Sequence, residues 1–237
     1  MVVSLSQKLT ILVTVALCVA LAIGFSSSRV LASNTPNFTQ TLNAGVLATD
    51  ILDASRVTVA SPTVAFSAKT FSFDCHYDGS PTNTASTGTL GTGTQRVYVM
   101  NPDAADNGWT LSIAATGGVT SAWDAGAATD YDFNDPTGSG CTDGADGDAF
   151  GGQLTIDANA GTLTADCLSC VTTNVTKGSS SSFNQGTTDS ITLLNAAAAS
   201  DDIWRGYLTG ATTSQTLPAE QPAGSYSLGM TLTVVAL

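Results

Sequence analysis

Basic residues, histidine and glutamate are scarce in this chain of 237 residues. Seven Lys and Arg residues stand against nineteen acidic residues, eighteen of them Asp, and the net charge is −12. Without a basic patch, binding to nucleic acid or anionic lipid is not expected. The low content of Lys and Glu disfavours long exposed helices, whereas abundant Asp favours turns and metal-binding loops.

Only one histidine is present, His76, and it lies beside Cys75 in the sequence. A serine or cysteine nucleophile needs a base and an orienting group within reach. We expect His76 to be a surface residue or one that flanks a disulfide. Paired Asp carboxylates can hydrolyse glycosides, but such sites are usually lined by aromatic residues, which make up 7% of the chain. The sequence therefore predicts a protein that is not an enzyme.

An apolar segment near the start predicts export. Residues 10–25 are almost wholly apolar, and Val30-Leu31-Ala32 follows after a few small residues. The segment is shorter than the roughly 20 residues needed to span a bilayer, and the Val-x-Ala end is typical of a signal-peptidase site. We expect residues 1–32 to be a cleaved signal peptide. Residues 33–237 then form one secreted domain, extracellular or at the cell surface, without membrane contact. An uncleaved membrane anchor is the alternative.

Four cysteines follow the predicted cleavage site, and an even number in an exported chain favours two disulfides. We expect Cys75 to pair with Cys141 and Cys167 with Cys170, although four cysteines allow three pairings. A redox-active Cys-x-x-Cys pair is usually placed at a helix N-terminus, and the sequence around Cys167 predicts no helix. Zinc would need a second cysteine pair or more histidines.

Apolar and polar residues alternate along most of the chain, which predicts β-strands. The expected strands cover residues 56–60, 63–73, 96–100, 109–114, 152–157, 161–165, 171–177, 190–195, 203–209 and 226–237. Turn signals between them predict an all-β antiparallel β-sandwich, Ig-like or jelly-roll-like, with Greek-key connections. Residues 48–54 predict a short helical turn, and residues 75–93 predict a loop.

One long acidic segment, Trp123 to Asp157, carries eight Asp residues and no Lys or Arg. Carboxylates at this density repel one another unless water, a cation or backbone donors relieve them. Glycine-rich loops with Asp and Asn suit the many oxygen ligands of calcium. The expected calcium ligands are Asp130, Asp132, Asn134, Asp143, Asp146 and Asp148. Their spacing is not that of an EF-hand, and a solvated acidic loop is the alternative.

Two motifs resemble those of known surface proteins. Gly108-Trp109-Thr110-Leu111 resembles the first W-x-L motif of WxL-type bacterial surface domains, secreted β proteins held non-covalently on Gram-positive cell walls. Residues 218–226 and the strand after them resemble the end of that family, and equally the last strand of spore-coat-U and pilus-type subunits. Met230-Thr231-Leu232 stands where a second W-x-L is expected. The resemblance implies export and a β fold, with cell-wall polysaccharide or peptidoglycan as partner.

Three functional hypotheses agree with these patterns. The first is an exported structural or adhesive β-sandwich, stabilised by calcium. The second is a subunit of a fibre or sheath, in which residues 33–47 and the closing strand exchange edges between copies. The third is a carbohydrate-binding module with Trp123 as its exposed platform. Trp109 and Trp204 lie in predicted strands, and we expect them to pack in the core.

Overall fold

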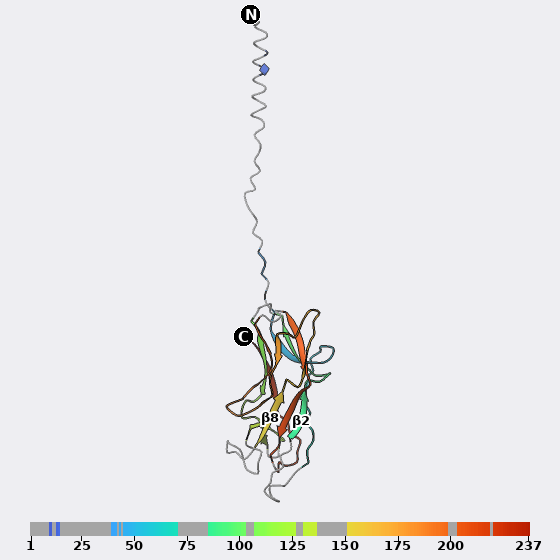
Figure 1. The fold of residues 1–237 in the computed structure, drawn as a ribbon, viewed down its shortest axis with the longest axis vertical. Coiled ribbons are helices and arrows are strands. Elements are labelled where there is room, and N and C mark those ends of the chain that lie inside the picture. Colours follow the sequence, from blue (N-terminus) through green and yellow to red (C-terminus); the bar gives the residue numbers. More distant parts are fainter. Residues whose placement is uncertain are drawn as a thin grey trace. The chain divides into compact units, whose positions relative to one another are not determined.

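The computed structural model describes residues 10, 13–14, 39–41, 43, 45–70, 85–102, 107–126, 130–136, 151–198, 203–218 and 220–237. Its contacts divide the chain into two units, Met1–Leu42 and Asn43–Leu237. The described residues of the second unit contain fifteen β-strands, paired antiparallel, and no helix (Figure 1). The predicted all-β sandwich class is confirmed.

The predicted signal peptide lies almost entirely outside the described residues, so its cleavage stays a prediction. Within the described part of the chain, no helix combines the length and apolar character that crossing a membrane requires.

Three pairs of consecutive strands each run from one sheet of the sandwich into the next, and we call each pair a strand path. They comprise β2 (Ala85–Leu90) with β3 (Arg96–Asn101), β8 (Gly152–Asp157) with β9 (Thr162–Ala165), and β13 (Trp204–Thr209) with β14 (Ala211–Thr216). β13 pairs with β3 and β9, and β14 pairs with β2 and β8. Figure 1 shows β14 between the labelled strands β8 and β2. Short strands complete the edges: β1 (Ala48–Leu52) beside β3, and β11 (Ser181–Ser182) and β7 (Asn134–Asp135) beside β8.

A glycine lies between the two strands of each path: Gly91, Gly161 and Gly210. Gly91 and Gly210 have positive φ values of 78° and 76°, a conformation that strains residues with a Cβ atom. The amide of Gly210 donates to the carbonyl of Gly91 at 2.7 Å. A Cβ atom on Gly161 would lie 2.8 Å from the carbonyl oxygen of Thr209. The three glycines therefore lie close together, at the place where each path passes from one sheet to the next.

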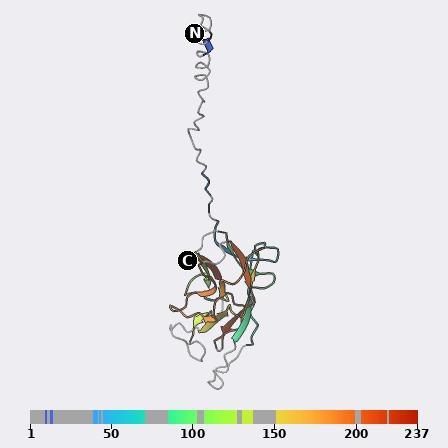
Figure 2. The same cartoon turned by 45° about the horizontal axis from the view of Figure 1, so that its top comes forward.

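The facing sheet has the order β10 (Val175–Lys177), β12 (Ile191–Ala196), β4 (Trp109–Ala115) and β15 (Met230–Ala236). A register shift between Thr192 and Leu194 interrupts the pairing of β12 with β4. Leu193 and Leu194 are both fully buried as a result, because a bulge breaks the alternation of faces. A separate small sheet pairs β5 (Ala122–Trp123) with β6 (Tyr131–Asp132). Figure 2 shows the sandwich from a second direction.

The core lies between the two sets of sheets. Every second residue of β4 is buried, including Trp109 and Leu111 at 0% exposure. The ring of Trp109 packs against that of Trp204 on β13, with centroids 5.4 Å apart. The prediction that these two tryptophans are core residues is confirmed.

Several local predictions were wrong because sheet pairing, rather than local propensity, decides weak strands. Residues 48–52, predicted to form part of a helical turn, form β1 along β3. Residues 85–90 lie in a predicted loop but form β2, although the segment contains Gly88. Gly88 lies opposite Thr213, and a Cβ atom at this glycine would lie 2.8 Å from the Thr213 hydroxyl. β14 was not predicted at all.

Other predicted strands are shorter than expected or absent. Residues 56–60 form only one bridge, between Thr58 and Leu52. The described part of the 63–73 prediction, residues 63–70, is not part of a sheet, although the Ser67 amide donates to the Thr87 carbonyl at 2.8 Å. β10 covers only residues 175–177, and β15 begins at Met230 rather than at residue 226.

Candidate binding site around Trp123

The hairpin of β5 and β6 positions two aromatic side chains at the start of the acidic segment. Trp123 and Tyr131 are register partners, and their rings stack with centroids 6.0 Å apart and planes 13° apart. Tyr131 is 4% exposed, and burial raises the pKa of its hydroxyl above the usual range. Tyr131 is therefore the buried member of the stacked pair, and Trp123 is the partly buried one.

Gln215 fixes this hairpin to the sandwich. It lies on β14 and is 1% exposed. Its Oε1 accepts a hydrogen bond from Trp123 Nε1 at 2.9 Å. Its Nε2 donates to the carbonyls of Asp132 and Thr216 at 3.0 and 2.9 Å. One buried amide thus connects the acidic segment to the central strand path.

Two more aromatic rings reach the hairpin from distant parts of the chain. Phe66 packs edge-on against Trp123, with centroids 5.2 Å apart. Tyr226 packs edge-on against Tyr131 at 5.0 Å. The Tyr226 hydroxyl donates to the Pro222 carbonyl at 2.7 Å and accepts from Gln221 Nε2 at 2.9 Å. The turn before β15 is therefore attached to the aromatic cluster.

These side chains surround a cavity of about 310 Å³, which we name the Trp123 pocket. Its walls combine four aromatic rings with hydrogen-bonding and charged groups. They include Phe66, Lys69, Trp123, Tyr131, Gln215, Glu220, Gln221 and Tyr226. Glu220, the chain's single glutamate, has a φ of 64°. Mixed walls of this kind suit a ligand with both apolar faces and hydroxyl groups.

Trp123 is partly buried and packs against the core, so it forms a wall of the pocket rather than an open platform. Its role in ligand contact stays a prediction. Sequence reasoning did not single out Phe66, Gln215 and Tyr226 as site residues. The Pro-Ala-Gly-Ser-Tyr turn could have indicated Tyr226 from the sequence. No sequence pattern indicated Gln215, because its segment was not predicted to be a strand.

The proposed calcium ligands fall partly within the described residues. Asp130 is half-buried, and its Oδ1 accepts from the amide of Ala125 at 3.5 Å. Asp132 and Asn134 are buried, and Asn134 Nδ2 donates to the Val119 carbonyl at 2.9 Å. The other three, Asp143, Asp146 and Asp148, lie outside the described residues. In the part of the chain that is described, no three His, Cys, Asp or Glu side chains gather as metal ligands would. Calcium binding stays a prediction.

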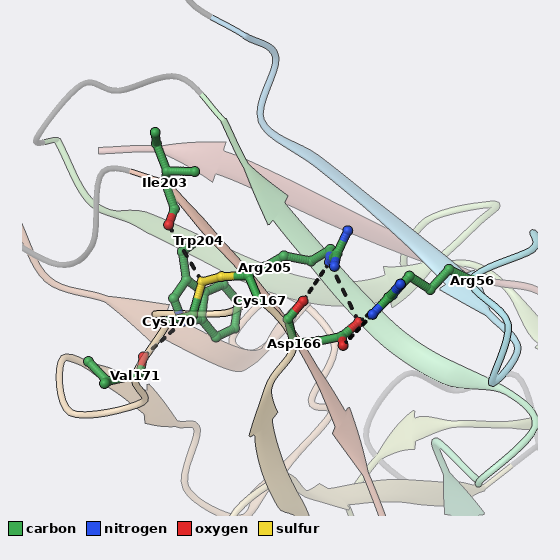
Figure 3. The surroundings of a disulfide bond; sticks show 8 residues. All are labelled: Arg56, Asp166, Cys167, Cys170, Val171, Ile203, Trp204 and Arg205. Atoms are coloured by element: carbon green, nitrogen blue, oxygen red, sulfur yellow. Dashed lines mark hydrogen bonds and ion pairs between the residues drawn. A yellow bond between two sulfur atoms is a disulfide. The ribbon is translucent and has the colours of Figure 1, made fainter.

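Cys167 and Cys170 form the predicted disulfide, shown in Figure 3. It lies beside Trp204, whose Nε1 donates to the Val171 carbonyl at 2.9 Å. The bridge closes the turn after β9, and the Trp204–Val171 hydrogen bond attaches this turn to β13. Cys75 and Cys141 lie outside the described residues, and their pairing stays a prediction.

Asp166, next to this disulfide, organises a network of charges (Figure 3). Arg56 makes a bidentate pair with the carboxylate, with both N–O distances 2.8 Å. The Tyr98 hydroxyl donates to it at 3.0 Å, and Arg205 Nε donates to the Asp166 carbonyl at 2.8 Å. Arg96 lies over the ring of Tyr207, 4.6 Å from its centroid. Asp166 binds Arg56 and Arg205, and Arg96 packs on Tyr207. Because each arginine contacts another residue of the protein, we interpret this cluster as structural.

Asp166 is expected to contribute stability that acid removes. Hydrogen bonding to Arg56 lowers its pKa from 3.8 to about 2. A lowered pKa in the folded state stabilises the protein above the unfolded value, and this contribution is lost as the pH falls through about 2. Urea unfolding at pH 6 should therefore show Asp166→Asn less stable than wild type, with the gap closing between pH 4 and pH 2. Asp189→Asn, at an exposed position, controls for the loss of one negative charge from this acidic chain. A constant gap at all pH values would contradict the assignment.

Comparisons with known protein families, with curated proteins and with solved structures find no match. The resemblance to WxL-type and spore-coat-U proteins therefore rests on the motifs alone. Trp109 and Leu111 of the W-x-L motif are fully buried, and Leu232 of β15 pairs with Ile113 of β4. In this chain, the W-x-L side chains belong to the core.

Proposed function

We propose that the protein is an exported, non-enzymatic adhesive protein of the cell surface that binds a saccharide in the Trp123 pocket. The observation that carries the proposal is the combination of four aromatic rings with amide and charged groups around one cavity. Sugar rings present apolar C–H faces and hydroxyl groups. The aromatic walls match the faces, and Gln221, Lys69 and Glu220 supply donors and acceptors for the hydroxyls.

The structure around the pocket supports binding rather than chemistry. Glycoside hydrolysis uses two carboxyl groups on either side of the scissile bond. Among the described residues that line the Trp123 pocket, Glu220 is the single carboxylate. The pocket is also held by a buried amide, Gln215, on a continuous β framework. A preformed site lowers the ordering cost of binding.

The predicted signal peptide and the acidic composition support an extracellular location for this activity. Cell-wall polysaccharide and peptidoglycan are the partners that the motifs imply. Both present sugar chains with repeated units, to which many copies of the protein attach without a covalent bond.

Retention of the purified protein on insoluble polysaccharides and peptidoglycan tests the proposal. We expect wild type to bind at least one polymer saturably, with a change in tryptophan fluorescence because Trp123 lines the pocket. Trp123→Phe keeps an aromatic ring but removes the Nε1 donor and part of the wall, and it should weaken binding about tenfold, equivalent to about 1.4 kcal/mol. Tyr207→Phe, an aromatic change outside the pocket, should bind as wild type does. Failure of wild type to bind any polymer would contradict the proposal.

A further inference from the structure

A second cavity, of about 360 Å³, lies between the sheets beside β15. We name it the β15 cavity. Core side chains from both sides of the sandwich line it. They include Leu90 of β2, Ile113 of β4, Leu154 and Ile156 of β8, and Met230 and Leu232 of β15. Most of these side chains are no more than 5% exposed, so the cavity reaches into the core.

The walls of the β15 cavity carry no Asp, Glu, Lys or Arg among the residues that the structure describes, although the chain has a net charge of −12. Val64, from the segment before β2, also lines the cavity. The rings of Phe66, Trp123 and Tyr226 line both this cavity and the Trp123 pocket, and they stand between an apolar chamber and a polar one. An ionised ligand would lose its hydration here without gaining a charged partner.

Thr63, Thr92, Gln95 and Ser227 also line the cavity and are exposed or half-buried, whereas Thr213 is a polar lining residue that is buried. Thr213 lies on β14 at a position whose side chain faces the core, and it is 4% exposed. Its Oγ1 is buried and has no hydrogen-bond partner within the described part of the chain. A buried hydroxyl without a partner is unfavourable. Gly88, its register partner on β2, lets this hydroxyl pack close to the β2 backbone, because a Cβ atom there would lie 2.8 Å from the hydroxyl and 3.0 Å from Val64 Cγ1.

We propose that the β15 cavity binds a neutral aliphatic molecule that has one hydrogen-bonding group, with the Thr213 hydroxyl as the partner of that group. The apolar walls favour the aliphatic chain, the lack of charge disfavours carboxylates and amines, and Thr213 sets the position of the polar end. Closed apolar cavities smaller than this one bind apolar ligands, and its volume is within the usual range for small-molecule sites. The proposal rests on Thr213 and the apolar walls, and it does not require saccharide binding in the Trp123 pocket.

Titration of the full secreted chain with 1-decanol, followed by tryptophan fluorescence and calorimetry, tests the proposal. We expect saturable binding with one site per chain. Decanoate at pH 8, which has the same chain length but a charge, should bind at least tenfold more weakly. Thr213→Val keeps the shape and removes the hydroxyl. It should weaken 1-decanol binding at least fivefold without lowering the melting temperature of the ligand-free protein.

A second pair of variants tests the location. Val64→Phe narrows the cavity and should weaken 1-decanol binding, whereas Val57→Phe should leave it unchanged, because Val57 is 61% exposed and lies outside the cavity. Absence of saturable 1-decanol binding by wild type would overturn the proposal. Equal affinities of wild type and Thr213→Val, or of 1-decanol and decanoate, would also overturn it. Polysaccharide retention by Thr213→Val should equal that of wild type, so failure here does not affect the saccharide proposal.

Discussion

Replacing Trp109 with alanine is expected to lower the free energy of unfolding by about 3–5 kcal/mol, the usual cost of removing a large aromatic side chain from a core. Trp109 is 0% exposed and packs against Trp204 across the sandwich. The truncation therefore leaves a cavity in the core between the two sheets. Urea denaturation, monitored by far-UV circular dichroism, measures the loss.

Two substitutions control for this result. Trp109→Phe should cost less, because a ring still fills part of the space. The indole Nε1 of Trp109 has no hydrogen-bond partner among the described residues, so no bond is lost. Thr110→Ala, one residue along β4 where the half-buried side chain faces away from the core, should cost no more than about 1 kcal/mol, the span of strand propensities. A loss below about 1 kcal/mol for Trp109→Ala would contradict the observed packing.

The strands that sequence analysis predicted well are those whose own side chains form the core. Residues 109–114 and 152–157 alternate large apolar residues with polar ones, and both segments form strands close to the expected bounds. The β2 and β14 segments, ASTGTL and ATTSQT, have few large apolar residues. Their place in the sheet comes from the strands beside them, and a single sequence does not contain that information.

Strands in the acidic segment were also missed by the sequence analysis. No strand was predicted between Trp123 and Gly152, yet residues 131–135 are all buried and contain β6 and β7. Phe133 supplies the reason, because it packs in the core against Phe183 with centroids 5.1 Å apart. The alternation of Tyr131 and Phe133 was the signal that the density of Asp concealed. Trp123 was proposed as a site residue from its sequence neighbours, and its hydrogen-bond partner Gln215 is visible only in the fold.

Gln215→Ala is expected to destabilise the protein by about 3 kcal/mol and to disturb the Trp123 pocket at the same time. The buried amide accepts from Trp123 and donates to two carbonyls, of Asp132 and Thr216. Truncation leaves these groups without their partner, and each buried polar group left unsatisfied costs about 1–3 kcal/mol. Urea unfolding at pH 7 measures the stability. Retention on the polysaccharide that wild type binds measures the pocket, and both should fall together.

Gln215→Glu keeps the size of the side chain and changes its hydrogen bonding, so it shows how much of the effect of Gln215→Ala comes from the lost hydrogen bonds. The carboxylate still accepts from Trp123 Nε1, but it faces the Asp132 and Thr216 carbonyls without a proton to donate. Burial and these acceptors favour the protonated form and raise the pKa of the introduced carboxyl in the folded state. Its destabilising effect should therefore be small near pH 4 and should grow as the pH rises to 7. If Gln215→Glu is equally stable relative to wild type at both pH values, or if Gln215→Ala costs less than about 1 kcal/mol, Gln215 does not hold the hairpin to the sandwich.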